Sequence, residues 1–430
     1  MLLFLTKNSK FSYLKKVNTS FFMICMVMSS MHAQNYNDFT KPQRDAIHQQ
    51  WNLDNWDNGG ELSRYTFLNM TEFWTHAIIN KKGNSNPLTV KYLPEIANFI
   101  TLSEKGELAL KDYVNVAPVD GMIILHNNAI VYEAYPRMLP EEKHVYMSVT
   151  KIVISTLVAI LEDRGVIDVS KPIDFYLPEL KGSGWQGAAV LDILDMASGI
   201  DCLESVEGAY ENPEKCIYQY EATLGFLRAT DATPKNTMDH IKSLKSQKPA
   251  GKRFEYTSVN TFVLSELIER VTNLSLAKNI ETKIWQKMGA DTGAVMAQQK
   301  GVPIAHAGLS STLRDLARFG NLFLNAENNN SLISSRYLNN IQQNGRSEIY
   351  AENWPPEDRL LQDAPRHNTY QWDMVMHDGD FYKEGFGGQG LYISPSRNLV
   401  IAFFGAPDDS GNTHELPKIA RQLAKSGMFE

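Results

Sequence analysis

The sequence predicts an α+β fold: an antiparallel sheet built from both ends of the chain, flanked by helices, with a mostly helical region inserted between its halves. β-rich runs form a tight hairpin near residues 121–135, helical signals dominate from about residue 166 to residue 345, and further hairpins follow residue 366. Because hairpins join antiparallel neighbours, this order disfavours a doubly wound parallel sheet. The chain has 430 residues, 43% of them hydrophobic, which is enough for a full-sized core.

Residues 1–33 have the layout of a secretory signal. Four lysines precede an apolar run at residues 20–28, and small residues then lead to Ala33, after which we expect cleavage. The apolar run is too short to span a bilayer. We therefore expect an exported protein, periplasmic or secreted, with no stable membrane insertion once the signal is removed.

The charge of the remaining chain argues against nucleic acid and anionic lipid as partners. Of the 42 basic residues, four lie in the signal, which has no acid, so 38 basic and 49 acidic residues remain and the net charge is −11. An acidic surface disfavours binding to nucleic acid or anionic lipid. We therefore expect neither as a partner.

Residues 34–84 are rich in Asn, Trp and Asp and are interpreted as an N-terminal extension. A helix is predicted over residues 65–79, which carry Phe67, Phe73 and Trp74. We expect this extension to pack on the main domain, residues 85–430.

The first hairpin is predicted over residues 121–125 and 129–135, with Asn127 and Asn128 in the turn. Asparagine tolerates the left-handed conformation that a tight turn needs. The chain soon enters a segment that is apolar on nearly every face and is followed by Gly165. This pattern predicts a buried helix with a C-terminal stop.

Ser148 and Lys151 lie where this helix begins. A spacing of three residues places both side chains on one face of a helix. Burial lowers the pKa of a lysine, and a neutral amine can accept the proton of a serine. The two residues are therefore a candidate nucleophile and base. The alternative is a capping serine followed by a surface lysine, which is what S-x-x-K usually means when it stands alone.

Further helices are predicted at residues 190–196, 261–271 and 311–324. Between the first two, Cys202 and Cys216 are the cysteines that remain after removal of the signal. In an exported chain they suggest one disulfide, with two free buried thiols as the alternative. The chain has neither C-x-x-C nor H-E-x-x-H and its histidines are scattered, so we expect no metal site.

Tyr256, Ser258 and Asn260 follow a Pro/Gly turn and precede the predicted helix at residues 261–271. Side chains on such a loop can point into a cleft. Tyr256 is a candidate second base, and the alternative is a core tyrosine whose hydroxyl is satisfied by the backbone. Ser258 and Asn260 also fit helix capping.

The end of the chain returns to strands. Residues 367–376 and 381–386 flank Asp378 and Gly379 and predict a second hairpin. Two more strands are expected within residues 391–404, around a turn at residues 395–398, and a last helix over residues 416–424.

Gly385, Gly387 and Gly390 match the pattern G-x-G-x-x-G. A dinucleotide site needs this pattern between a strand and a helix, and no helix follows here. We expect instead that these glycines let a substrate lie against an edge strand.

Three stretches of the chain stand in a recognisable order: Ser148-Val149-Thr150-Lys151, Tyr256-Thr257-Ser258 and Lys383-Glu384-Gly385. They are similar to the S-x-x-K, Y-x-N and K/H-T-G motifs of the serine β-lactamase and penicillin-binding superfamily. The chain resembles its class C-like branch over about residues 121–404. That branch includes family VIII carboxylesterases, DD-peptidases and 6-aminohexanoate-dimer hydrolases. Three motifs in family order are far more specific than one.

The resemblance implies a β-lactamase/transpeptidase-like fold and a serine hydrolase that needs no cofactor. Ser148 would attack an ester or amide carbonyl to form an acyl-enzyme, and Lys151 and Tyr256 would be the proton-transfer pair, with either one as the resting base. The backbone amides of Ser148 and Phe386 would hold the oxyanion. The substrate would be bound by Ser258, Asn260, Lys383 and Gly385.

The chain departs from the family pattern at two positions. Ser258 stands where β-lactamases have asparagine, which is similar to the nylon-oligomer hydrolase type. Glu384 stands where a threonine or serine would bind a carboxylate, and its charge would repel one. We therefore expect a small ester or amide as the substrate rather than penicillin.

Other functions stay open at this point. A penicillin-binding-like peptidase or β-lactamase is one, and a pseudoenzyme that senses peptides or is acylated without turnover is another. A Ser-His-Asp hydrolase using His306 is a weaker alternative, because the chain has no G-x-S-x-G elbow.

Overall fold

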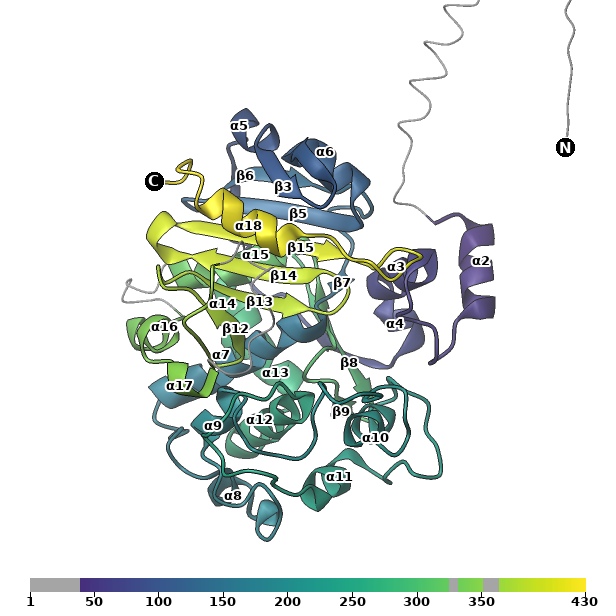
Figure 1. The fold of residues 1–430 in the computed structure, drawn as a ribbon, viewed down its shortest axis with the longest axis vertical. Coiled ribbons are helices and arrows are strands. Elements are labelled where there is room, and N and C mark those ends of the chain that lie inside the picture. The colour runs from purple at the N-terminus through teal and green to yellow at the C-terminus, as the bar shows by residue number, and fades with distance from the viewer. Residues whose placement is uncertain (1–38, 325–331, 351–362) are drawn as a thin grey trace, which may run out of the picture. The chain divides into compact units, whose positions relative to one another are not determined.

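A sheet of eight strands brings the two ends of the chain together in the computed structural model, which describes residues 39–324, 332–350 and 363–430 (Figure 1). Its strands are β2 (Thr89–Val90), β5 (Val119–His126), β6 (Ala129–Ala134), β11 (His367–Thr369), β12 (Trp372–Val375), β13 (Phe381–Gly385), β14 (Gln389–Ser394) and β15 (Leu399–Gly405). They follow the order β11-β12-β13-β14-β15-β5-β6-β2, so that β15 pairs with β5, and only β2 and β6 pair in parallel. The predicted sheet from both chain ends is confirmed.

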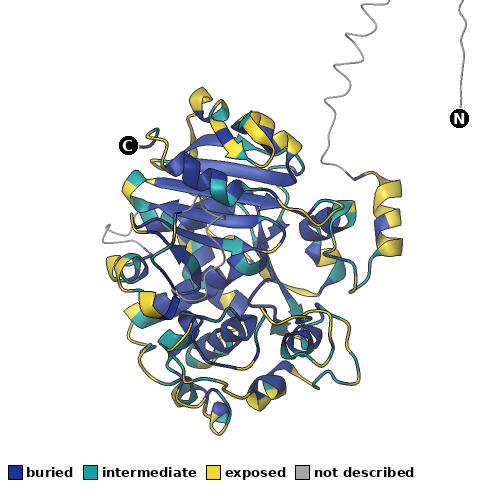
Figure 2. Ribbon diagram, viewed as in Figure 1, coloured by how far each residue is buried: buried dark blue, intermediate teal, exposed yellow. Residues whose placement is uncertain are grey.

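Helices cover both faces of this sheet, and the sequence of β15 shows why. Alternate residues of a strand point to opposite faces. Leu399, Ile401 and Phe403 join a core with α6 (Leu110–Val116) and α18 (Leu416–Ala424). Val400, Ala402 and Phe404 join a core with α7 (Thr150–Asp163) and α15 (Leu313–Asn321). A strand buried on both faces has to be apolar throughout, and Figure 2 shows the central strands of the sheet as buried.

The predicted helices of the middle region are present. They are α7, α9 (Val190–Leu194), α12 (Ser258–Thr272) and α15, and Gly165 follows α7 with a left-handed φ of 66°. Twelve of the fourteen residues of α7 are buried, as its apolar sequence requires. The region also contains strands that its helical signals did not predict. These are β8 (Ala294–Gln299), β9 (Val302–Pro303) and β10 (Leu309–Ser311).

A second, smaller sheet contains these strands. It runs in the order β1-β8-β10-β7, with β9 beside β8, where β1 is His76–Ile79 and β7 is His144–Val145. The strand β7 ends three residues before Ser148, so this sheet positions the chain that leads into α7.

The helix predicted over residues 65–79 is confirmed only in its first part. This stretch instead forms the end of α3 (Gly60–Leu68), then α4 (Met70–Phe73), and then β1. The chain leaves the helix at Asn69, whose φ is −128°, and β1 pairs antiparallel with β8 from Ile79 to His76. A strand partner more than two hundred residues away decides this local structure, so the local pattern could not indicate it.

Residues 367–376 also differ from the single strand that was predicted. They form β11 and β12, joined by a tight turn at Tyr370 and Gln371, whose φ values are 46° and 64°. These residue types do not mark such a turn. Long-range hydrogen bonds hold Gln371 there, from its backbone N–H to the Leu194 carbonyl at 2.8 Å and from the Thr261 hydroxyl to its side chain at 2.8 Å.

The other predictions for strands and helices are confirmed. Asn127 and Asn128 make the turn between β5 and β6 with φ values of 49° and 64°, and the hairpins β12–β13 and β14–β15 are formed. The helix expected at residues 311–324 begins at Leu313, where the Thr312 side chain accepts the Asp315 N–H, and a 3₁₀ turn, Leu322–Leu324, extends it.

The remaining elements surround this framework. They are α2 (Lys41–Gln50), α5 (Pro94–Ala97), α8 (Ile173–Tyr176), α10 (Cys216–Thr223), α11 (Thr237–Ser243), α13 (Leu276–Ile280), α14 (Gln286–Met288), α16 (Ser335–Gln343), α17 (Ser347–Tyr350), and the hairpin of β3 (Ile100–Ser103) and β4 (Gly106–Ala109). The expected signal, residues 1–33, lies outside the described residues. Within the described ranges, every helix is too short or too polar to cross a membrane.

Candidate active site

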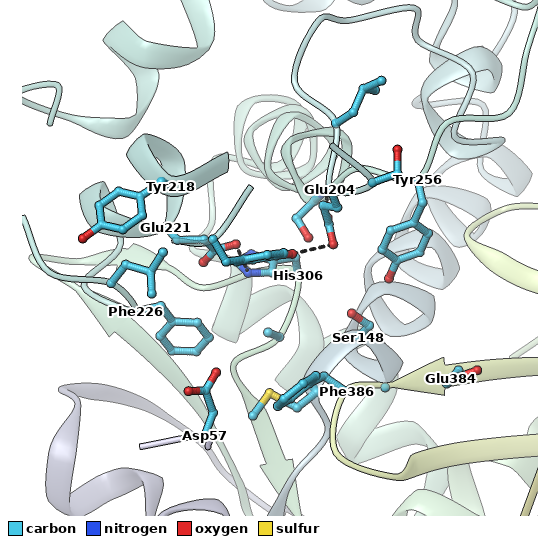
Figure 3. A pocket seen from close by; sticks show the side chains of 18 of the residues that line it. Asp57, Ser148, Glu204, Tyr218, Glu221, Phe226, Tyr256, His306, Glu384 and Phe386 are labelled. Atoms are coloured by element: carbon cyan, nitrogen blue, oxygen red, sulfur yellow. Dashed lines mark hydrogen bonds and ion pairs between the residues drawn. The ribbon is translucent and has the colours of Figure 1, made fainter. Parts of the chain in front are cut away.

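Ser148 and Tyr256 line a cavity of about 1170 Å³, and the amine of the buried Lys151 lies close to both side chains. The cavity lies between the end of β13, the start of α12, α10 and a stretch of the N-terminal segment, residues 53–58. In Figure 3 the side chains of Ser148 and Tyr256 point toward the same space. Elements far apart in the sequence therefore build one site.

Ser148 sits in a 3₁₀ turn, Met147–Val149, directly before α7. The residue before it, Met147, has a φ of 46°, in the left-handed region that residues other than glycine rarely adopt. Such a conformation persists only where the surroundings enforce it, and it is typical of functional sites. It turns the chain sharply between β7 and α7 and leaves Ser148 half-buried at the cavity wall.

Lys151 is fully buried in the first turn of α7. Its Nζ donates to the Ser148 Oγ at 2.9 Å and to the His306 carbonyl at 3.3 Å. Burial lowers the pKa of Lys151 to about 8, against the charge of Glu204, which raises it. A useful fraction of Lys151 is then neutral near pH 7 and can accept a proton from Ser148.

Tyr256 lies on the loop before α12, between two amines. The Nζ atoms of Lys151 and Lys383 are 4.9 and 5.0 Å from the centre of its ring, and the Lys383 Nζ is 3.3 Å from its hydroxyl. Burial raises the pKa of Tyr256 well above its usual value, and the charge of Asp373 acts in the same direction, whereas a hydrogen bond with Ser148 opposes them. The phenol is therefore protonated at rest.

The third motif lines the opposite wall. Lys383 is buried, and its Nζ is paired with Asp373 at 2.7 Å. Gly385, the last residue of β13, lies close to the turn that carries Ser148, which we call the serine turn. A Cβ at this position would be only 2.6 Å from the Tyr146 carbonyl oxygen. Phe386 follows and is 54% exposed in the cavity. Its backbone amide thus leaves the strand beside Ser148.

Of the two predicted binding residues at the start of α12, the structure places Ser258 at the cavity and Asn260 away from it. Ser258 lines the cavity as the first residue of α12. Asn260 is fully buried, and its Nδ2 contacts the Met196 sulfur at 3.4 Å. Two residues along a helix turn the side chain through about 200°, so that it faces away from the cavity. Asn260 is therefore not placed to bind a substrate, contrary to the expectation from sequence.

The cavity also holds acids that the motifs did not indicate: Asp57, Glu204 and Glu221 (Figure 3). Burial raises the pKa of Asp57, and the charge of Glu221 adds to this effect. Asp57 comes from the N-terminal segment and Glu221 from α10, so no local pattern could have joined them. Only Glu204 had a signal in the sequence, because it begins the run of acids that follows Cys202.

The imidazole of His306 contacts Glu221 and Tyr220 and not Ser148. Its Nε2 lies 3.0 Å from Glu221 and its Nδ1 lies 3.0 Å from the Tyr220 hydroxyl. Its backbone carbonyl accepts a hydrogen bond from the Lys151 amine at 3.3 Å. This arrangement does not support a Ser-His-Asp hydrolase.

Cys202 and Cys216 are joined by a disulfide with their Cα atoms 5.2 Å apart. Together with His240 they are the only group among the described residues whose ligand atoms lie close enough to share a metal ion. Sulfurs that are joined to each other are not thiolates, so this donor set does not suit a metal.

Known proteins resemble this chain in sequence and in fold. The sequence profile of the family described as Beta-lactamase matches residues 113–424. The 6-aminohexanoate-dimer hydrolase of Paenarthrobacter ureafaciens is 27% identical over 369 residues, covering 84% of this chain and 90% of that protein.

Solved structures share the fold. A putative 6-aminohexanoate-dimer hydrolase from Bacillus anthracis has a TM-score of 0.73 at 23% identity and covers 87% of this chain and 96% of its own. A class C β-lactamase in complex with cefoxitin has a TM-score of 0.53 at 14% identity, covering 74% of this chain and 97% of its own. The predicted β-lactamase/transpeptidase-like fold is confirmed. The chain belongs to the β-lactamase family of serine hydrolases.

Proposed function

We propose that this protein is an exported serine hydrolase that cleaves a small ester or amide through an acyl-enzyme on Ser148. The observation that carries the proposal is the 2.9 Å hydrogen bond between the Lys151 amine and the Ser148 hydroxyl, inside a cavity that also holds the Tyr256 phenol. A nucleophile paired with a buried amine is the arrangement that covalent catalysis requires.

Lys151 is the resting base in this proposal. Its pKa of about 8 leaves part of it neutral at pH 7, whereas Tyr256, whose pKa is raised, keeps its proton. Lys151 accepts the Ser148 proton as the oxygen attacks the carbonyl carbon. Tyr256 donates its proton to the leaving group and is then reprotonated from Lys151. Water later attacks the acyl-enzyme by the same route in reverse.

The tetrahedral intermediate carries a negative charge on the former carbonyl oxygen. The backbone N–H groups of Ser148 and Phe386 are the proposed donors to this oxygen. The close approach of Gly385 to the Tyr146 carbonyl supports this assignment, because it brings the end of β13 to the serine turn. Losing one such donor typically costs about a hundredfold or more in rate.

The charge of the cavity points to the substrate class. Asp57, Glu204, Glu221 and Glu384 line it, and one oxygen of Glu221 is buried without a hydrogen-bond partner. These acids favour a linear substrate that carries an ammonium group and disfavour one with a carboxylate at the third motif. The relative from Paenarthrobacter, named for a dimer of 6-aminohexanoate, is consistent with a linear amide.

A fluorophosphonate probe tests the site. Intact-mass analysis is expected to show one adduct, and peptide mapping is expected to place it on Ser148. Ser148→Ala should remove the adduct and lower the hydrolysis of short-chain nitrophenyl esters by at least about a thousandfold. An adduct on another residue contradicts the proposal, and an adduct on Ser148 without ester turnover favours the sensor alternative.

Export is tested separately from catalysis. Expression of the full chain in a bacterium with a periplasm should yield a mature protein outside the cytoplasm. Its measured mass should match a chain that begins at Gln34. Full-length protein retained in the cytoplasm would contradict export and leave the hydrolase proposal intact.

A further inference from the structure

The disulfide between Cys202 and Cys216 closes a loop beside the catalytic tyrosine. We call residues 203–215 the disulfide loop. Its side chains Leu203, Glu204, Ser205, Tyr210 and Glu211 form part of the cavity wall. The sequence assigned the two cysteines only a structural role.

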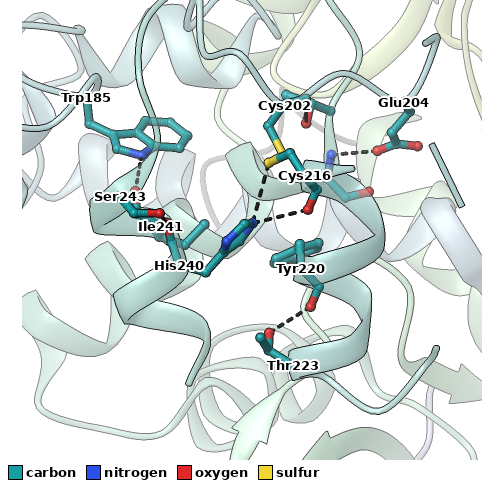
Figure 4. Close-up of a disulfide and its surroundings, with 11 residues drawn as sticks. Trp185, Cys202, Glu204, Cys216, Tyr220, Thr223, His240, Ile241 and Ser243 are labelled. Carbon is teal, nitrogen blue, oxygen red and sulfur yellow. Dashed lines mark hydrogen bonds between the residues drawn. A yellow bond between two sulfur atoms is a disulfide. The ribbon is translucent and has the colours of Figure 1, made fainter. Parts of the chain in front are cut away.

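Two hydrogen bonds connect Cys202 and Glu204 to the residues that follow Tyr256. The Thr257 hydroxyl donates to the Cys202 carbonyl at 2.5 Å, and the Ser258 backbone N–H donates to the Glu204 carboxylate at 2.6 Å. Figure 4 shows the bond that Glu204 accepts and its place beside the disulfide. The two acceptors belong to Cys202 itself and to Glu204, two residues further on. The disulfide therefore restrains the positions of both acceptors.

The position of Glu204 is chemically specific. Ser258 is the first residue of α12, so its N–H lies at the positive end of a fifteen-residue helix. The other carboxylate oxygen of Glu204 accepts the Tyr210 hydroxyl at 2.6 Å, from within the same loop. Glu204 therefore joins the loop to the turn that aims Tyr256.

Charge repulsion acts within this loop. The loop carries four acids, Glu204, Glu207, Glu211 and Glu214, and one base, Lys215, and seven of its thirteen residues are exposed. Like charges on an exposed loop repel one another. The covalent bond opposes this repulsion.

We propose that Glu204 is a positioning residue for Tyr256 and that the Cys202–Cys216 disulfide holds it in place, so that reduction of this disulfide slows catalysis. This inference rests on the proposed hydrolase function. It adds a group that touches no reacting atom: its hydrogen bond with the Ser258 N–H positions the turn after Tyr256, and its charge raises the pKa of Lys151.

The disulfide can be reached by a reductant. Cys216 is half-buried, whereas Cys202 is almost fully buried, and the Cys216 sulfur lies 3.4 Å from the His240 Nε2. A dithiothreitol thiolate attacks the Cys216 sulfur, the sulfur–sulfur bond breaks, and Cys202 leaves as a thiolate that takes a proton from water. The second thiol of the reagent then closes its own disulfide and releases the Cys216 thiol, which completes a two-electron reduction.

The first experiment compares the oxidised protein, the protein reduced with dithiothreitol, and the double variant Cys202→Ser/Cys216→Ser. We expect kcat for a nitrophenyl ester to fall about tenfold to a hundredfold on reduction, because small misplacements of a catalytic group cost rates of this size. Reoxidation should restore it, and the double variant should be slow and insensitive to dithiothreitol. Full kcat in protein whose two free thiols are verified by alkylation and mass overturns the inference.

The second experiment separates positioning from folding. Glu204→Ala should lower kcat, and Glu204→Gln should recover most of it, because the amide oxygen still accepts the Ser258 N–H. The Gln variant should also shift the acidic limb of the pH profile to lower pH, since the charge of Glu204 raises the pKa of Lys151. Glu207→Ala, which removes an exposed acid of the same loop outside the cavity, is the control and should behave as wild type. A Gln variant as slow as the Ala variant overturns the inference.

Hydrogen exchange distinguishes this inference from the proposed function. Reduction should speed exchange of the amides of residues 256–260 even in Ser148→Ala, which has no turnover. If the oxidised wild type neither hydrolyses esters nor labels at Ser148, the proposed function fails. If exchange in this stretch is unchanged by reduction, the positioning role fails.

Discussion

The burial of one amine, Lys151, sets the pH range in which this site can work. Its pKa is lowered to about 8, and it has to be neutral to accept the Ser148 proton. We therefore expect kcat/KM for a neutral nitrophenyl ester to rise with pH through a midpoint near 8. Because Lys151 interacts with Tyr256, the measured midpoint belongs to the pair. A rate that falls as the pH rises from 6 to 8 would contradict this assignment.

Glu384 is expected to set the response to charged substrates. It lines the cavity in the third motif, and the residue is half-buried. Glu384→Thr should lower KM for an ester that bears a carboxylate by about tenfold, or about 1.4 kcal/mol, because a repulsive charge is removed. Steady-state kinetics with a matched neutral ester is the control, and its KM should stay within about twofold. An equal fall for both esters would mean that size, not charge, is responsible.

Individual residues differ in how far the sequence could reveal them. Ser148, Lys151 and Tyr256 lie in short motifs whose spacing reflects local geometry, and the structure brings them together. Asp57 and Glu221 have no such motif, because their proximity depends on the packing of the N-terminal segment against α10. Asn260 was expected on a loop, whereas it lies buried in α12, which has already begun at Ser258.

The strand β13 has to approach the serine turn closely, and Gly385 permits this. A Cβ at this position would lie 2.6 Å from the Tyr146 carbonyl oxygen and 2.9 Å from the Gln389 Cβ, both closer than real contacts. Gly385→Ala should push the strand away and misplace the Phe386 N–H. We expect kcat to fall by about a hundredfold, as for loss of an oxyanion donor. Thermal unfolding should show that the variant still folds, and wild-type kcat in the folded variant would exclude this role for the strand.

The secondary structure follows the same division between local and distant causes. The Asn127–Asn128 turn and α7 are specified by their own residues, and the sequence predicts both. The strand β1 and the Tyr370–Gln371 turn depend on β8 and on α9 and α12, which lie far away in the sequence. No local pattern could indicate them.

Considered as one molecule, the chain uses its N-terminal segment as part of the hydrolase fold. Residues 39–84 supply β1 to the smaller sheet and residues 53–58 to the cavity wall. Their large aromatic side chains join the same core as α7 and α15. The predicted boundary at residue 85 stays a prediction, but these contacts imply that the two sides of it unfold together.

Trp56 tests this coupling. It is 4% exposed, donates from Nε1 to the Phe226 carbonyl at 3.2 Å, and packs against the Phe226 ring at 5.1 Å between centres. Trp56→Ala should lower the free energy of unfolding by about 3 to 5 kcal/mol. Trp56→Phe keeps most of the packing and is the matched control, with a loss of roughly half that size or less.

The decisive measurement is the shape of the unfolding curve. If residues 39–84 and the rest of the chain share one core, Trp56→Ala should shift a single transition, observed identically by circular dichroism and by loss of ester hydrolysis. An extension that merely rests on the surface would instead melt first, in a separate transition, while hydrolysis persisted. Because Trp56 lines the cavity, the coupled result would also make the N-terminal segment a determinant of which substrates fit beside Ser148.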